Sequence, residues 1–114
     1  MLKSKLEFLD FYLDLEDKQP ASIIFFRKDL NRLRFWILIL KAYYNSEVII
    51  VEDIIKKRKF ISKPSVLKII NEAVEHGFLE KSQFDSDRRK LPIIPTERTI
   101  KEFEEFYSIF KSNF

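Results

Sequence analysis

Residues 61–81 read ISKPSVLKIINEAVEHGFLEK and carry the clearest structural signals in the chain. Ser62 or Lys63 can cap a helix that tolerates Pro64 in its first turn, because a proline there lacks only an N–H that has no partner within the helix. Gly77 suits the left-handed conformation that ends a helix. The inner face is predicted by apolar residues at helical spacing, namely Val66, Ile70, Ala73 and Val74. We therefore expect a helix that ends at this glycine.

The segment after the glycine predicts a β-hairpin followed by a helix. Two runs suited to strands, 79–84 and 90–94, flank a polar tip at 85–89. Pro92 confines the second strand to an edge or to a position whose N–H faces away from the ladder. Thr96 then opens a last helix, whose apolar residues are Ile100, Phe103, Phe106, Tyr107, Phe110 and Phe114.

The segment before residue 61 predicts further helices. Four leucines, Leu2, Leu6, Leu9 and Leu13, form one stripe of a first helix that ends near residue 18. Ser22 can cap a second helix that runs to about Tyr44 and is apolar enough to be central to the core. The β-branched run at 48–51 predicts a short strand, and residues 52–59 predict a brief helix.

Composition excludes several classes of function. The 114 residues fit a single domain, 1–114, with no cysteine, one histidine and one glycine. Disulfides, a histidine or thiolate metal site, a Cys/His nucleophile and a glycine-rich phosphate loop are therefore excluded, and we expect no enzyme, no cofactor and no metal. The longest apolar run, 35–40, cannot span a bilayer, and the N-terminus lacks a secretory signal, so a cytoplasmic protein is expected.

Basic residues gather in two islands although the net charge is only +3. Residues 55–71 contain six basic residues and no acid, and residues 88–101 contain five basic residues and one acid. Such segregated positive charge favours a polyanionic partner.

The order of the predicted elements is that of a winged helix-turn-helix, a mainly α fold with a small β-hairpin wing (α+β). In such a fold the second helix of the pair turns its outer N-terminal face to the major groove of DNA. Lys63, Ser65 and Lys68 occupy that part here, and the N–H groups of the helix end add an anion-binding site.

The chain resembles the MarR family of bacterial transcriptional regulators over residues 33–109. Residues 61–81 look like the recognition helix of that family running into the first wing strand, and Asp87, Arg88 and Arg89 match its wing-tip motif. The resemblance implies that the two arginines enter or border the minor groove while Asp87 orients one of them. The terminal helices are shorter than is usual for the family.

These arguments predict two sets of site residues. The DNA-binding set lies in the helix-turn-helix and wing, residues 46–95, and comprises Lys56, Lys57, Arg58, Lys59, Ser62, Lys63, Ser65, Lys68, Arg88, Arg89 and Lys90. The dimerisation set lies in the terminal helices, 1–19 and 97–114, and comprises Leu2, Leu6, Leu9, Leu13, Phe103, Phe106 and Phe110. The alternative is that the apolar residues of both terminal helices are buried in the core of a monomer.

The function expected from the sequence is sequence-specific binding of double-stranded DNA by a homodimer, with transcription regulation as its purpose. The dimer would act as a repressor that reads a pseudo-palindromic operator. The alternative is a winged-helix protein–protein interaction module, such as an antirepressor or assembly factor, without base readout. The resemblance also implies a small aromatic effector, but the aromatic residues of the chain identify no pocket, and without cysteine there is no thiol-based sensing.

Overall fold

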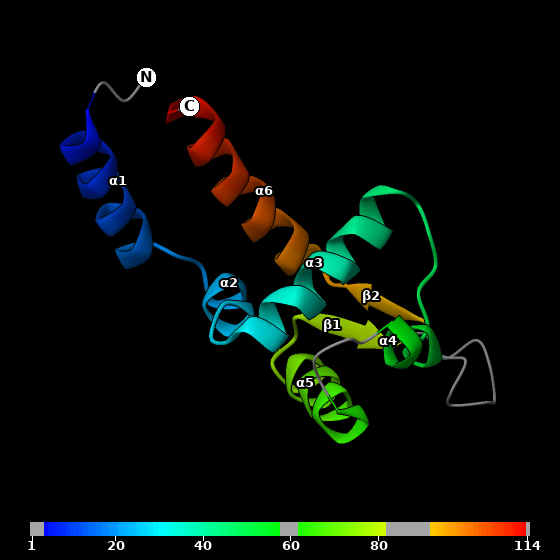
Figure 1. The fold of residues 1–114 in the computed structure, drawn as a ribbon. Coiled ribbons are helices and arrows are strands. Elements are labelled where there is room, and N and C mark those ends of the chain that lie inside the picture. Colours follow the sequence, from blue (N-terminus) through cyan, green and yellow to red (C-terminus); the bar gives the residue numbers. More distant parts are fainter. Residues whose placement is uncertain (1–3, 58–61, 82–91, 114) are drawn as a thin grey trace.

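The computed structural model describes residues 4–57, 62–81 and 92–113. The molecule is mainly helical, with one two-stranded antiparallel sheet, and measures 54 × 26 × 23 Å. The elements are α1 (Lys5–Asp17), α2 (Ala21–Phe26), α3 (Leu30–Tyr44), α4 (Val51–Lys57), α5 (Lys63–Glu75), β1 (Leu79–Lys81), β2 (Ile93–Pro95) and α6 (Glu97–Asn113). Figure 1 shows that α1 and the end of α6 project together from the part that holds the other elements.

The single helix expected from Ser22 to Tyr44 is wrong, because the segment forms two helices. Asp29 caps α3 through its Oδ1, which accepts the N–H of Arg32 at 2.8 Å. Ser22 is not a cap but the second residue of α2, and it is fully buried. An aspartate followed by an apolar residue is itself an N-cap signal, and its extended backbone starts α3 as a new helix after α2 has ended at Phe26.

The strand expected at residues 48–51 is reduced to a single bridge. Ile50 pairs with Pro92, and the N–H of Ile93 donates to the carbonyl of Ile49 at 2.9 Å. Val51 already belongs to α4, so the β-branched run is divided between the bridge and the helix. Strand β2 therefore has the 49–50 segment on one side and β1 on the other.

The expected helix at the centre of the sequence is confirmed as α5, and both of its ends match the prediction. The Oγ of Ser62 accepts the N–H of Ser65 at 3.3 Å, which caps the helix. At the other end Gly77 has φ of +79°. The N–H of Phe78 donates to the carbonyl of Ala73, and the N–H of Gly77 donates to that of Val74, the bond pattern of a Schellman motif.

Within the described residues the two predicted strands are present as β1 and β2, with Leu79 opposite Pro95 and Lys81 opposite Ile93. Residues 82–91 of the predicted hairpin lie outside the described residues. Thr96 caps α6 as expected, because its Oγ1 accepts the N–H of Thr99 at 3.3 Å. The Thr99 hydroxyl is buried and donates to the carbonyl of Phe78 at 2.7 Å. The start of α6 is thus bonded to the turn between α5 and β1.

The core lies where α2, α3, α5 and the sheet meet. Its fully buried side chains come from separate elements, with Phe26 on α2, Ile39 on α3, Ile70 on α5 and Leu79 on β1. Trp36 stacks on Phe26 with 6.2 Å between ring centroids. Because α5 buries only its inner face in this core, its outer face is left at the surface.

Two polar contacts bind α6 to the earlier helices. Glu102 accepts hydrogen bonds from the N–H and hydroxyl of Ser22, at 3.0 and 2.6 Å, and from the Nε of Arg98 at 3.0 Å. Burial alone would raise the pKa of Glu102, but these hydrogen bonds together hold it below its ordinary value. Nearer the middle of α6, burial and a hydrogen bond to Glu104 raise the pKa of Tyr44 to about 12.

Candidate nucleic-acid interface

The N-terminal turn of α5 is exposed and is capped by Ser62. Ser62, Lys63, Pro64 and Ser65 all lie at the surface. The hydroxyl of Ser62 donates to that of Ser65 at 2.9 Å and also accepts the amide of that residue. Since Pro64 has no N–H and the Ser65 amide serves the cap, this end offers fewer amide donors to an anion than expected from the sequence.

Lys68 stands one turn further along the outer face of α5. Its side chain is 74% exposed, and its Nζ lies 3.9 Å from the Oε1 of Glu72. An exposed pair at this distance contributes little and leaves the ammonium group accessible to a ligand. The same carboxylate is held more closely by the guanidinium of Arg32, at 2.8 Å. Arg32 therefore neutralises much of the acidic charge beside the lysine.

Asn71 and Lys81 extend the same surface, and sequence reasoning missed both. The Nζ of Lys81 on β1 donates to the Oδ1 of Asn71 at 3.1 Å, and both residues are exposed. Asn71 follows Lys68 by three residues, so helical periodicity could have placed it on the outer face. The position of Lys81 depends on how β1 folds back along α5 and has no local signal. Glu75, one turn beyond Asn71, adds an acid to this face.

Arg32 positions α5 against the rest of the molecule. Its guanidinium contacts Asp29 at 3.0 Å and Glu72 at 2.8 Å, and its side chain is only 14% exposed. It also lies over the ring of Phe25, 5.1 Å from the centroid. These contacts join the end of α2 and the start of α3 to the C-terminal half of α5 and hold its outer face in a defined orientation.

Some of the remaining predicted DNA-binding residues lie in the described part of the chain, and the others lie outside it. Lys56 on α4 is exposed and pairs with Glu52 at 3.3 Å. Lys57 is the last residue of α4, and nothing is described of its side chain. The others lie outside the described residues, namely Arg58, Lys59, Asp87, Arg88, Arg89 and Lys90. The DNA contacts predicted for the wing arginines therefore stay a prediction.

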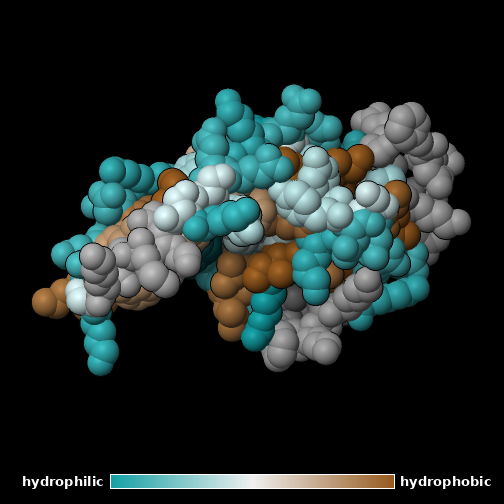
Figure 2. Space-filling view, turned by 90° about the horizontal axis from the view of Figure 1, so that it is seen from above, coloured by the Kyte–Doolittle hydropathy of each residue, from teal (hydrophilic) through white to brown (hydrophobic). Residues whose placement is uncertain are grey.

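The predicted dimerisation residues behave differently on the two terminal helices. On α1, Leu6, Leu9 and Leu13 are 74%, 55% and 65% exposed, which leaves an unpartnered leucine stripe. Figure 2 shows apolar side chains at the end of the elongated molecule where this helix lies. Leu2 lies outside the described residues.

The aromatic residues of α6 are half-buried within their own chain rather than outward-facing as a set. Phe103 contacts the ring of Trp36 at 5.7 Å, and Phe106 packs against the core. Phe110 meets Phe11 of α1 edge to face at 5.9 Å. Much of this stripe is therefore used to attach α6 to α3 and α1, and the leucine stripe is the larger exposed surface.

The described residues offer few groups suited to other chemistry. No cluster of three or more histidine, aspartate or glutamate side chains within 4–57, 62–81 and 92–113 could hold a metal ion. His76, the C-cap of α5, is exposed, and its ring centroid lies 5.8 Å from those of both Phe25 and Phe78. Over these same ranges, no helix has the length and apolar character needed to cross a membrane.

Comparison with known proteins leaves the functional argument to the residues themselves. No family model, no curated protein and no solved structure matches this chain.

Proposed function

We propose that this chain is a winged helix-turn-helix protein of the MarR type, which binds double-stranded DNA as a homodimer and regulates transcription. In this proposal α4 and α5 form the helix-turn-helix, and the hairpin of β1 and β2 forms the wing. The observation that carries the proposal is the outer face of α5. There Lys63, Lys68 and Asn71 are exposed on a helix whose opposite face is buried.

The chemistry of this face suits a nucleic acid. A lysine can bond to a phosphate or to guanine, and an asparagine can form paired bonds with adenine in the major groove. The hydrogen bond from Lys81 holds the Oδ1 of Asn71 and adds a second cation beside it. Glu72 offers little repulsion because Arg32 neutralises it.

Fluorescence anisotropy with a labelled random-sequence duplex tests the proposal. A dimer that makes six to ten phosphate contacts predicts a slope of roughly −5 to −9 for log affinity against log salt concentration. Lys68→Ala should weaken binding and reduce the slope by about one. Lys101→Ala is the matched control, because it removes the same charge from an exposed position on α6. Equal effects of the two variants, or binding insensitive to salt, would refute the proposal.

Selection from a random DNA pool tests base readout and symmetry together. If the terminal helices pair across a two-fold axis, the selected sites should contain two inverted half-sites about one helical turn apart. Asn71→Ala should relax the preference at one position in each half-site. Sites without inverted symmetry would argue against the dimer.

Dimerisation itself is tested by sedimentation equilibrium. Leu9→Glu places a charge within the leucine stripe and should shift the molecule toward monomer. Ile24→Glu is the control, because Ile24 is also exposed, at 56%, but lies on α2 away from the stripe. A monomeric wild-type protein at micromolar concentration would contradict this part of the proposal.

A protein–protein interaction module is the second candidate, and the same leucine stripe favours it. A large unpartnered apolar surface on α1 fits a different protein as well as a second copy. Glu75 on the outer face of α5 also opposes close approach of DNA phosphates. Absence of binding to heparin and to random DNA at low salt would favour this candidate.

A further inference from the structure

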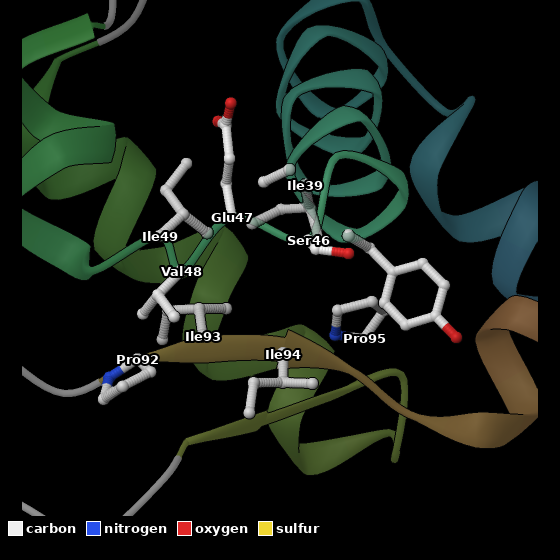
Figure 3. A pocket seen from close by; sticks show the side chains of 11 residues that line it. Ile39, Ser46, Glu47, Val48, Ile49, Pro92, Ile93, Ile94 and Pro95 are labelled. Atoms are coloured by element: carbon white, nitrogen blue, oxygen red, sulfur yellow. The ribbon is translucent and has the colours of Figure 1, made fainter.

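An apolar pocket lies beside the sheet, away from the outer face of α5. Its volume is about 440 Å³, and its walls come from the C-terminal end of α3, the 46–49 segment and strand β2. Figure 3 shows Val48, Ile93, Ile94 and Pro95 around it, with Ile39 on the opposite wall. Cavities that bind small molecules have volumes of about 300–1,000 Å³ and mainly apolar walls.

The pocket opens to solvent through apolar side chains. Val48 is 74% exposed, and Tyr43 and Ile94 are each just over 40% exposed. An apolar ligand that covers these residues would bind favourably, because it removes their apolar surface from water. The floor is closed by Ala42 and Ile93, which are both buried.

The polar groups at the rim define the chemistry of the ligand. The described residues that line the pocket include no lysine, arginine or histidine. The one carboxylate among them, that of Glu47, points away from the cavity in Figure 3. The hydroxyls of Ser46 and Tyr43 are neutral, and each can donate one hydrogen bond and also accept from a ligand. Among the described lining residues, an anionic ligand would therefore find no cationic partner to offset its lost hydration.

We propose that this pocket binds an uncharged, largely apolar small molecule of two or three rings, or an alkyl-aromatic alcohol of similar size. The size follows from the volume, because a cavity of about 150 Å³ already accommodates benzene. The hydroxyl of such an alcohol would meet Ser46 or Tyr43 at the rim. This site does not depend on the DNA-binding proposal, and its tests use the protein alone.

Binding is measured first with N-phenyl-1-naphthylamine, an uncharged dye that fluoresces in apolar surroundings, added to the full chain. The wild-type protein should give a saturable signal. Ala42→Leu fills the floor of the pocket and should weaken binding at least about fivefold, because the added side chain takes the space of the ligand. Ile94→Ala removes part of the exposed wall and should weaken it about threefold or more. This second variant alters a half-exposed residue, so it decides the outcome if Ala42→Leu fails to fold.

Ile37→Ala is the matched control. Ile37 is 45% exposed on the same helix but lines a separate shallow groove between α3 and α6. Its replacement should leave dye binding unchanged. Loss of binding in this variant, with no change in Ile94→Ala, would move the site to that groove and overturn the proposal, as would a signal that does not saturate.

The charge preference is tested by displacement of the dye with two compounds that share a skeleton, 4-phenylbutan-1-ol and 4-phenylbutanoate. The alcohol should displace the dye at concentrations at least about tenfold lower than the carboxylate. Equal potency, or a preference for the carboxylate, would refute the assignment of an uncharged ligand.

Discussion

Replacement of Glu102 by alanine should be among the most destabilising single changes on the surface of α6. The carboxylate binds the N–H and the hydroxyl of Ser22 across 80 residues of sequence, and Ser22 is fully buried. Ser22 is the second residue of α2, so its N–H is one of those that a helix leaves without an internal partner. Glu102 therefore serves as the N-terminal cap of α2 from a different helix.

The magnitude follows from the groups left without partners. A buried donor that loses its acceptor costs about 1–3 kcal/mol, and Glu102→Ala leaves two buried donors of Ser22, the N–H and the hydroxyl, without an acceptor. The pair with Arg98 adds only a few tenths, because the arginine side chain is 53% exposed. We expect a loss of about 2–4 kcal/mol in the free energy of unfolding, which would lower the melting temperature by roughly 10 °C.

The pH dependence provides an independent check. Because the pKa of Glu102 is lowered in the fold, its ionised form contributes stability that is fully present above its unfolded pKa of about 4.5. That contribution is lost as the pH falls through the lower folded value. The difference in stability between the wild type and Glu102→Gln should therefore shrink when the pH is lowered below 4.5.

Urea unfolding followed by fluorescence measures both effects, because Trp36 is the single tryptophan and is buried in the core. Glu105→Ala is the control, since Glu105 is an exposed acid on the same helix. If Glu102→Ala and Glu105→Ala have the same stability, the capping role of Glu102 is wrong. A difference between wild type and Glu102→Gln that grows on acidification would also refute the reasoning.

Three further changes test other parts of the structure. Arg32→Ala should lower the unfolding free energy by about 1–3 kcal/mol in urea titrations, because Glu72 loses its close cationic partner. An unchanged urea midpoint would contradict the role of Arg32 in holding α5. Gly77→Ala should cost about 1 kcal/mol through its φ of +79° alone, since no atom beyond the adjoining residues lies within 4 Å of the added methyl group, and a stabilised variant would refute this. Tyr44→Phe should remove from the alkaline ultraviolet titration the tyrosine with a pKa of about 12; persistence of that step would assign it to another tyrosine.

Sequence reasoning succeeded for the elements whose ends depend on neighbouring residues. The cap at Ser62, the turn at Gly77 and the start of α6 after Thr96 were all predicted, because each depends on groups within one helical turn. The break before α3 has a signal of the same kind at Asp29. It was missed because the apolar pattern on both sides of it was treated as one helix.

The strand expected at 48–51 failed for a different reason. β-Branched residues favour strands, but a strand also needs a partner along its length, and within the described residues this run makes a single bridge, between Ile50 and Pro92. Likewise, the aromatic stripe of α6 could be placed on one face from its spacing. Whether that face met a second copy or α3 and α1 of the same chain depended on packing.

The sequence alone therefore determined where the central helix begins and ends, which of its faces is apolar and where the basic residues are concentrated. The tertiary structure alone decided that Glu102 caps α2, that Lys81 lies beside Asn71, that α1 keeps an exposed leucine stripe and that a pocket opens next to β2. The physical reason is the distance along the sequence between the groups that interact. Caps and turns are satisfied within a few residues, whereas these other features join groups that only the packing of separate elements brings together.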